Sequence, residues 1–188
     1  MYKIVEFSKV LIENFLKTLD KDIICVDATL GNGNDALFMS QLINENGKVY
    51  GYDIQEQSLI NSNNLFKEND VKNIETKLKS HEFIDEENID LCIFNLGYLP
   101  GFDKTIKTNK DTTKNALINL LPKMNKENML IIICLYVGHK EGLEESIVID
   151  EFLKELPSNK YLVCKYQNYN RPTSPYILTI SYNKKTKH

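Results

Sequence analysis

The chain lacks several features that would assign it to specialised classes of protein. It contains no tryptophan, and only one of its 23 basic residues, Arg171, is an arginine. Phosphate groups would therefore be bound mostly by lysine point charges rather than by the bidentate fork of a guanidinium group. The formal net charge of −3 also excludes a polybasic protein that coats nucleic acid or anionic membranes through bulk charge.

Long apolar runs are missing as well. The longest run, residues 129–136, has the length of a strand, whereas a membrane-spanning helix needs about 20 apolar residues. Residues 1–6 lack the basic stretch and the apolar region of a signal peptide. We therefore expect a cytoplasmic protein with no membrane contact. Its 188 residues predict one domain over residues 1–188, with a helix in residues 1–20 and a frayed basic tail at residues 183–188.

The cysteines show no pattern of a metal or redox site. The four residues are far apart, form no C-x-x-C pair and each lie within a short apolar run: Cys25, Cys92, Cys134 and Cys164. This context is typical of small buried side chains on strands. We therefore expect all four to be buried and no metal to be bound.

Short apolar runs alternate with segments of helical periodicity along nearly the whole chain. Strands are expected at residues 23–28, 48–52, 74–78, 89–94, 129–136, 161–166 and 176–182. Helices are expected over residues 7–15, 35–43, 56–67, 111–121 and 143–156, the last with Ile147, Phe152 and Leu156 on one side. Residues 95–109 are expected to form a loop, and no helix separates the last two strands. This order predicts a Rossmann-like, mostly parallel seven-stranded sheet with an antiparallel strand near one edge and helices on both faces.

Two of the expected strands are followed by residues suited to a nucleoside. The first strand leads through Asp27 into a loop with Gly31 and Gly33, where the backbone can approach a ligand closely. The second strand ends at Asp53, 20 residues after Gly33, where a carboxylate accepts both ribose hydroxyls. Because ligands of open α/β sheets bind beyond the carboxyl ends of the strands, this pattern predicts a nucleoside-containing cofactor.

Two cofactors compete for this loop. Gly31, Gly33 and Ala36 satisfy the G-x-G-x-x-A pattern of dinucleotide sites. A pyrophosphate would, however, meet Asp27 and Asp35 with no basic residue in the loop. S-adenosylmethionine instead carries an ammonium and a sulfonium group, which acidic residues stabilise. We therefore expect S-adenosylmethionine rather than NAD.

The end of the fourth strand suggests the substrate. The carbonyl oxygens of Asn95 and Leu96 can accept hydrogen bonds from an amine, and Tyr98 offers a ring for stacking. The alternative is a turn in which Tyr98 covers the edge of the core. The position directly after a strand of the expected cofactor-binding sheet favours a flat, nitrogen-bearing substrate.

Taken together, these motifs resemble those of the rRNA methylase family, which are class I S-adenosylmethionine-dependent methyltransferases of one domain. The shared motifs are Asp27-x-x-x-Gly31-x-Gly33, Asp53-Ile54-Gln55, Ser80-His81-Glu82, Asn95-Leu96-Gly97-Tyr98-Leu99-Pro100 and Gly138-His139-x-Glu141-Gly142. The resemblance spans residues 7–180, and the chain departs from the family pattern at residues 101–105 and 167–172. A characterised branch of the family methylates the aminomethyl group of wobble 2-thiouridine in tRNA. The resemblance therefore implies a tRNA methyltransferase that forms 5-methylaminomethyl-2-thiouridine.

The motifs and the resemblance also assign roles to individual residues. Cofactor binding is expected of Asp27, Gly31, Asn32, Gly33, Asn34, Asp35, Asp53, Gln55, Ser80, His81 and Asn95. Catalysis is expected of Asn95, Tyr98 and His139, although His139 fits the cap of the following helix equally well. Contacts with the substrate or with tRNA are expected of Leu96, Tyr98, Lys104, Lys107, Lys110, Tyr136 and Arg171.

The expected partner is the anticodon stem-loop of tRNA, and a homodimer is one of the assembly states left open. The lysines of residues 104–114 also fit a solvated face. Methylation of rRNA or of a small-molecule amine, or nucleotide binding without catalysis, remain as alternatives.

Overall fold

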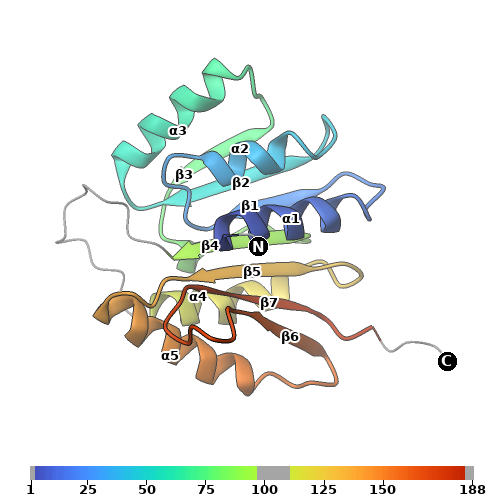
Figure 1. Cartoon of the computed structure of the whole chain (residues 1–188). Coiled ribbons are helices and arrows are strands. Elements are labelled where there is room, and N and C mark those ends of the chain that lie inside the picture. Colours follow the sequence, from blue (N-terminus) through green and yellow to red (C-terminus); the bar gives the residue numbers. More distant parts are fainter. Residues whose placement is uncertain (1–2, 97–110, 185–188) are drawn as a thin grey trace.

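The computed structural model describes residues 3–96 and 111–184. Its centre is a seven-stranded sheet with the order β3-β2-β1-β4-β5-β7-β6 (Figure 1). The strands are β1 (Ile24–Asp27), β2 (Lys48–Asp53), β3 (Ile74–Leu78), β4 (Leu91–Leu96), β5 (Leu130–Leu135), β6 (Tyr161–Tyr166) and β7 (Tyr176–Tyr182). Strands β1 to β5 are parallel, whereas β7 runs antiparallel to both of its neighbours. This topology confirms the predicted fold class.

Helices cover both faces of the sheet (Figure 1). One face packs against α1 (Ile4–Leu16), α2 (Asn34–Ser40) and α3 (Glu56–Glu68). The other face packs against α4 (Thr112–Leu120) and α5 (Lys140–Lys154). Two short 3-10 helices, η1 (His81–Phe83) and η2 (Leu121–Lys123), complete the regular structure of the described residues. In this part of the chain, no helix combines the length and apolar character needed to cross a membrane.

Alternate residues of the central strands pack into opposite layers. In β4, Leu91 and Ile93 face the layer of α1 to α3, whereas Cys92 and Phe94 face the layer of α4 and α5. A strand buried on both faces needs an unbroken apolar run. This requirement explains why the central strands could be recognised from the sequence.

The fourth strand lies further along the chain than predicted. It begins at Leu91, because Ile89 forms an isolated bridge with Met124 outside the sheet ladder. It continues through Asn95 and Leu96, which were expected in a loop but pair with β5. The predicted start of the loop was therefore wrong, and Asn95 is held by the sheet itself.

One cysteine prediction was also wrong. Cys25, Cys92 and Cys134 are buried as expected, but Cys164 is exposed. Cys164 lies on β6, which is the edge strand of the sheet. An edge position leaves a strand less covered than the central ones, whatever the apolar character of its sequence.

Helix α5 departs from the predicted pattern at Ile147, one of the three residues expected to share one side. Ile149 and Leu153 are buried, whereas Ile147 is 48% exposed. One turn before Ile149, the inward position is taken by the buried polar side chain of Glu145. The apolar period of the helix is therefore incomplete, which is why the apolar residues alone do not show that Ile147 is exposed. Phe152 and Leu156 do pack against the core.

Candidate active site

Polar residues at the ends of β1, β2 and β4 meet where the strand order reverses. β1 lies between β2 and β4, and its last residue, Asp27, is in register with Ile93 of β4. Asp53 ends β2, and Asn95 lies next to the last residue of β4. Open α/β sheets bind their ligands at this switch point. The topology thus brings together three of the residues predicted to form the site.

Asn95 is fixed by two hydrogen bonds to the segment that follows β1. Its side-chain Nδ2 donates to Oδ2 of Asp35 at 3.1 Å, and its backbone N–H donates to Oγ1 of Thr29 at 2.8 Å. Asp35 lies in the first turn of α2. Since the donor half of the amide is used by Asp35, the carbonyl half is left to accept a hydrogen bond from an amine.

Asp27 lies close to two other acidic residues, Asp35 and Asp53, and the three form an acidic cluster. Its side chain is buried, and Oδ1 accepts a hydrogen bond from the backbone N–H of Thr29 at 3.1 Å. Burial, followed by the nearby charge of Asp35, raises the pKa of Asp27 to about 8. A cation bound beside this carboxyl would favour its ionised form. The site is therefore built to receive positive charge.

The glycine loop has a left-handed backbone at both of its glycines. The φ angle is +49° at Gly31 and +82° at Gly33, a region that residues with a side chain rarely adopt. A Cβ atom at Gly33 would also lie 2.7 Å from side-chain atoms of Ser62 and Phe66 in α3. Gly33 is thus required by the packing of α3 as well as by the turn.

Asp53 links the loops that follow β1 and β2. Its Oδ2 accepts the backbone N–H of Gly31 and its Oδ1 accepts that of Gln55, both at 2.9 Å. Each carboxylate oxygen can accept a second hydrogen bond. Asp53 is therefore held in place with acceptor capacity left for the two hydroxyls of a ribose, and Gln55 lies beside it.

The side chains of Asn32 and Asn34 do not join the acidic cluster. Both are exposed, whereas Asp35 is buried. Oδ1 of Asn32 accepts a hydrogen bond from Nδ2 of Asn61 at 3.1 Å, and both asparagines line a separate groove of about 350 Å³ beside α3. Any contact of Asn32 and Asn34 with the cofactor would therefore be made by their backbone groups.

His81 and Ser80 follow β3 at the same edge of the sheet. The Ser80 hydroxyl caps η1 by accepting the backbone N–H of Glu82 at 3.3 Å. The His81 ring is buried at 5.7 Å from the ring of Phe94, and its Nε2 has no hydrogen-bond partner. Burial lowers the pKa of His81 and keeps the ring neutral. A buried polar atom without a partner fits a position that a ligand completes.

The Gly138–Gly142 motif forms the start of α5. His139 is the N-cap residue of α5, with an extended backbone and no side-chain capping bond. A Cβ atom at Gly142 would lie 2.2 Å from the carbonyl oxygen of Tyr136 and 2.9 Å from the ring of His139. The motif therefore needs glycine at position 142 for close packing, and the catalytic role of His139 stays a prediction.

Sequence reasoning missed two contacts, one within the site and one between α4 and α5. Thr29 holds the backbone of Asn95, and nothing in its local sequence signals this role. Glu145 is a buried carboxyl that accepts a hydrogen bond from Oγ1 of Thr113 at 2.6 Å between α4 and α5. Burial raises its pKa. A glutamate in a helix normally indicates an exposed face, so there was no reason in the sequence to expect that Glu145 is buried.

The remaining predicted residues are placed in three ways. Tyr98, Lys104, Lys107 and Lys110 lie outside the described residues. Leu96 is half-buried at the end of β4 and Tyr136 directly follows β5, where burial raises its pKa to about 12. Arg171 is exposed in the loop between β6 and β7. In residues 3–96 and 111–184, no three His, Cys, Asp or Glu side chains cluster as metal ligands.

Comparison with known proteins identifies relatives along most of the chain. The model of the family described as "Putative rRNA methylase" matches residues 49–181. A crystal structure of a putative rRNA methylase from Clostridium thermocellum is 29% identical with a TM-score of 0.88, covering 97% of this chain and 98% of that one. A putative methyltransferase from Streptococcus mutans, solved in complex with SAH, is 33% identical with a TM-score of 0.83, covering 97% and 99%.

A curated relative adds a more specific description. The chloroplastic tRNA (mnm(5)s(2)U34)-methyltransferase of Arabidopsis thaliana is 34% identical in an alignment of 176 residues that covers 86% of this chain. The match spans 64% of the length of that relative. The family model covers well over half of the described fold and includes the ends of β2 and β4 and the start of α5. The chain therefore belongs to the rRNA methylase family.

Proposed function

We propose that the protein is an S-adenosylmethionine-dependent methyltransferase that modifies tRNA. Its acceptor is the amine of 5-aminomethyl-2-thiouridine at the wobble position, and its product is 5-methylaminomethyl-2-thiouridine. The observation that carries the proposal is the Asn95–Asp35 hydrogen bond beside the buried carboxyl of Asp27. The description of the 34% identical relative and the SAH bound to the Streptococcus mutans neighbour support it.

The residues of the site fit this cofactor. S-adenosylmethionine supplies a methyl group already activated by its positively charged sulfur. Asp27 and Asp35 would stabilise its ammonium and sulfonium groups, because opposite charges favour the ionised carboxyls. Asp53 has acceptor capacity for the ribose, and the unpartnered Nε2 of His81 offers a hydrogen bond to the base.

The site would help most by positioning a neutral amine. An alkylamine has a pKa near that of lysine, ~10.4, so holding it neutral at pH 7 costs about 4–5 kcal/mol. Partial burial and the positive charge of the cofactor both lower this pKa, so no strong general base is needed. The carbonyl oxygens of Asn95 and Leu96 would orient the amine, and the Asp35 carboxylate makes the Asn95 oxygen a better acceptor by polarising the amide.

An anticodon loop suits a domain of this size. Its unstacked bases can enter a site without melting of a helix, and a base carrying an aminomethyl group can be read from one edge. We extend the proposal to the anticodon stem-loop as the bound part of the tRNA. A cytoplasmic location stays a prediction, since the curated relative is described as chloroplastic.

The proposal is tested by methyl transfer in a purified system. The protein and S-adenosylmethionine are incubated with tRNA that carries the aminomethyl group and, separately, with the same transcript lacking it. We expect one methyl group per modified tRNA and none on the unmodified transcript. Equal transfer to both would overturn the proposed acceptor, and turnover of a free metabolic amine without RNA would support a small-molecule methyltransferase instead.

A further inference from the structure

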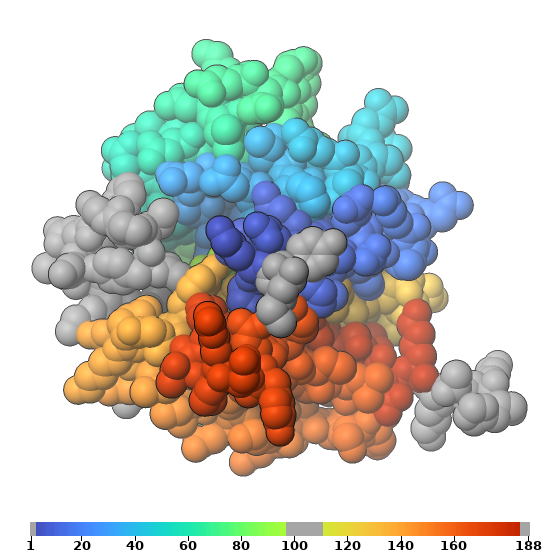
Figure 2. Space-filling model, viewed as in Figure 1, coloured from blue at the N-terminus to red at the C-terminus, as the bar shows by residue number. Residues whose placement is uncertain are grey.

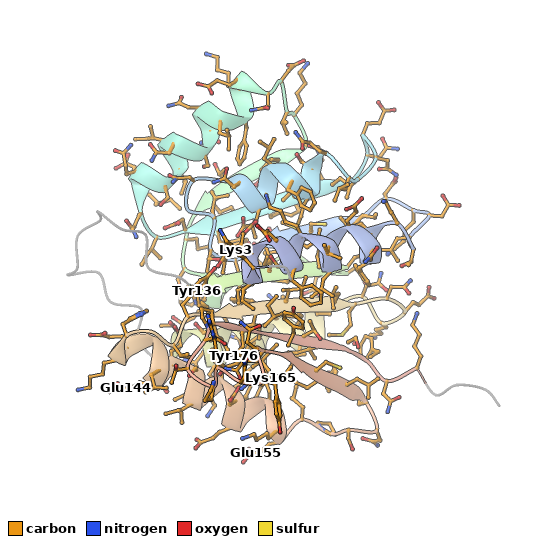
Figure 3. The ribbon with its side chains drawn as sticks, viewed as in Figure 1. Lys3, Tyr136, Glu144, Glu155, Lys165 and Tyr176 are labelled. Carbon is orange, nitrogen blue, oxygen red and sulfur yellow. The ribbon has the colours of Figure 1, made fainter. Side chains whose placement is uncertain are left out.

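A second cavity adjoins the candidate active site. It has a volume of about 310 Å³ and lies between the start of α1, the end of β5 and the loop between β6 and β7. Its lining residues are Lys3, Ile4, Val5, Tyr136, Tyr166, Asn168, Ser174 and Pro175. Figure 3 labels Lys3 and Tyr136 at this place, and Figure 2 shows the orange-red loop residues beside the blue start of α1. The volume falls at the lower end of the range of ligand pockets.

Tyr136 belongs to the wall of the cavity and lies near residues of the active site. This residue directly follows Leu135, which pairs with Leu96 at the end of β4. Tyr136 is also close enough to Asp35 for that charge to contribute to its raised pKa. Asp35 in turn binds the amide of Asn95. The part of the cavity wall formed by Tyr136 therefore lies next to the end of β4, which carries Asn95.

The walls of the cavity combine rings with two hydrogen-bonding groups. The ring of Tyr166 is fixed by stacking on Phe7, with centroids 4.0 Å apart and planes inclined by 25°. Asn168 offers an amide, and the buried Oγ of Ser174 has no hydrogen-bond partner. Buried hydroxyl groups are nearly always paired, so this one indicates a polar group that enters the cavity. Aromatic walls with an amide and a hydroxyl suit the ring and edge of a nucleobase.

The loop above the cavity is ordered by its own contacts and carries groups suited to RNA. Nε2 of Gln167 donates to the carbonyl oxygens of Pro172 and Ser174, at 2.9 and 3.0 Å. Tyr169 is fully exposed within this loop, and Arg171 is exposed two residues later. An exposed ring beside a basic side chain is typical of surfaces on which bases of single-stranded RNA stack.

We propose that this cavity binds the base of a nucleotide adjacent to the methylated one in a single-stranded RNA loop. The inference rests on the proposed function, since it assumes an RNA substrate at Asn95. Tyr136 and Tyr166 hold the ring, and Asn168 and Ser174 donate to or accept from its edge. Lys3 lines the cavity and Arg171 is exposed in the same loop as Asn168, so both could meet phosphates of the bound RNA.

The test uses the double variant Asn168→Ala with Ser174→Ala and an anticodon stem-loop labelled with a fluorophore. Loss of a hydroxyl that has no partner should leave thermal stability unchanged or raised, because no hydrogen bond within the protein is lost. We expect the affinity for the stem-loop to fall five- to twentyfold, with the affinity for S-adenosylmethionine within twofold of the parent. The matched control is Asn183→Ala, whose amide binds the carbonyl oxygen of Ser158 at another part of the surface.

Stem-loops with an abasic site on either side of the wobble position identify the bound base. The parent should lose affinity with one of the two, and the double variant should bind that abasic loop and the intact loop equally. Equal affinity of parent and double variant for the intact loop would contradict the proposal that the cavity binds a base, whether or not methyl transfer occurs. Loss of RNA affinity in the variant together with no methyl transfer by the parent would retain the pocket and reject the proposed function.

Discussion

The side-chain amide of Asn95 donates a hydrogen bond to the carboxylate of Asp35 at 3.1 Å, across 60 positions of sequence. The contact joins the end of β4 to the first turn of α2. It therefore fixes the residue that would orient the substrate to the loop that would bind the cofactor. A change in either Asn95 or Asp35 should therefore affect the place where the substrate meets the cofactor.

Replacement of Asn95 should separate catalysis from cofactor binding. We expect Asn95→Ala to lower kcat about 10- to 100-fold with a change in cofactor affinity below threefold, because orienting the amine is the main role proposed for the amide and its expected contact with the cofactor contributes less. The measurement pairs steady-state methyl transfer with calorimetric titration of S-adenosylmethionine. Asn115→Ala serves as the control, since it breaks an amide–carboxylate pair of the same length, to Glu82, on the surface. A loss of equal size in kcat and in cofactor affinity would assign Asn95 to the cofactor instead.

Replacement of Asp53 should act on cofactor affinity. We expect Asp53→Ala to weaken binding of S-adenosylmethionine at least tenfold, because hydrogen bonds to a charged group are worth ~1.5–3 kcal/mol each. Circular dichroism checks that the fold persists despite the loss of the bonds to Gly31 and Gln55. The exposed acid Glu13 provides the control variant Glu13→Ala. Unchanged affinity in the Asp53 variant would remove this residue from the site.

The raised pKa of Asp27 predicts opposite effects of pH on stability and on cofactor binding. The folded protein holds the Asp27 proton up to about pH 8, whereas the unfolded chain releases it near pH 4. The free energy of unfolding should therefore fall as pH rises from 4 to 8, by up to about 1.4 kcal/mol per unit from this group. The variant Asp27→Asn should lack this part of the slope in chemical denaturation at several pH values.

A bound cation favours ionised Asp27, so binding of S-adenosylmethionine below pH 8 should release a proton. We expect affinity to rise by up to about tenfold per pH unit between pH 6 and 7.5. Calorimetry in buffers of different ionisation enthalpy counts the released protons. A parent protein that releases no more protons than Asp27→Asn would contradict the assignment.

The glycines of the Gly138–Gly142 motif should differ in their tolerance of a methyl group. At Gly142 the added Cβ would lie 2.2 Å from the Tyr136 carbonyl oxygen, whereas at Gly138 no atom lies within 4 Å. We expect Gly142→Ala to lower the free energy of unfolding by about 1–3 kcal/mol through overpacking. Gly138→Ala should be neutral or slightly stabilising, because alanine restricts the unfolded chain. Denaturation by urea measures both, and similar losses in the two variants would show that the close approach at Gly142 is not the cause.

Much of the fold was predictable because its signals are local. The run that forms β5 is apolar on both faces, and the β6 and β7 runs lie between polar segments, so their bounds were recognised within a residue. Local patterns failed where a contact with another element decides the outcome. Ile89 is apolar but lies outside β4 because it forms a bridge with Met124. Cys164 lies within an apolar run but is exposed because its strand is at the edge of the sheet.

The acidic residues of the site could be predicted from the sequence, but the hydrogen bonds that join its segments could not. Asp27 and Asp53 directly end strands, and topology then brings them together. The hydrogen bonds from Asn95 to Thr29 and from Thr113 to Glu145 join positions 66 and 32 residues apart. Such contacts depend on how the helices pack on the sheet, and no short sequence motif encodes them.

The central claim is that this protein adds the methyl group to the wobble aminomethyl-2-thiouridine of tRNA. Mass spectrometry of tRNA nucleosides tests it most directly in cells with and without the protein, and in cells restored with the Asn95→Ala variant. We predict that loss of the protein removes 5-methylaminomethyl-2-thiouridine and accumulates 5-aminomethyl-2-thiouridine, and that the variant restores little of the product. An unchanged level of the methylated nucleoside in cells without the protein would contradict the claim.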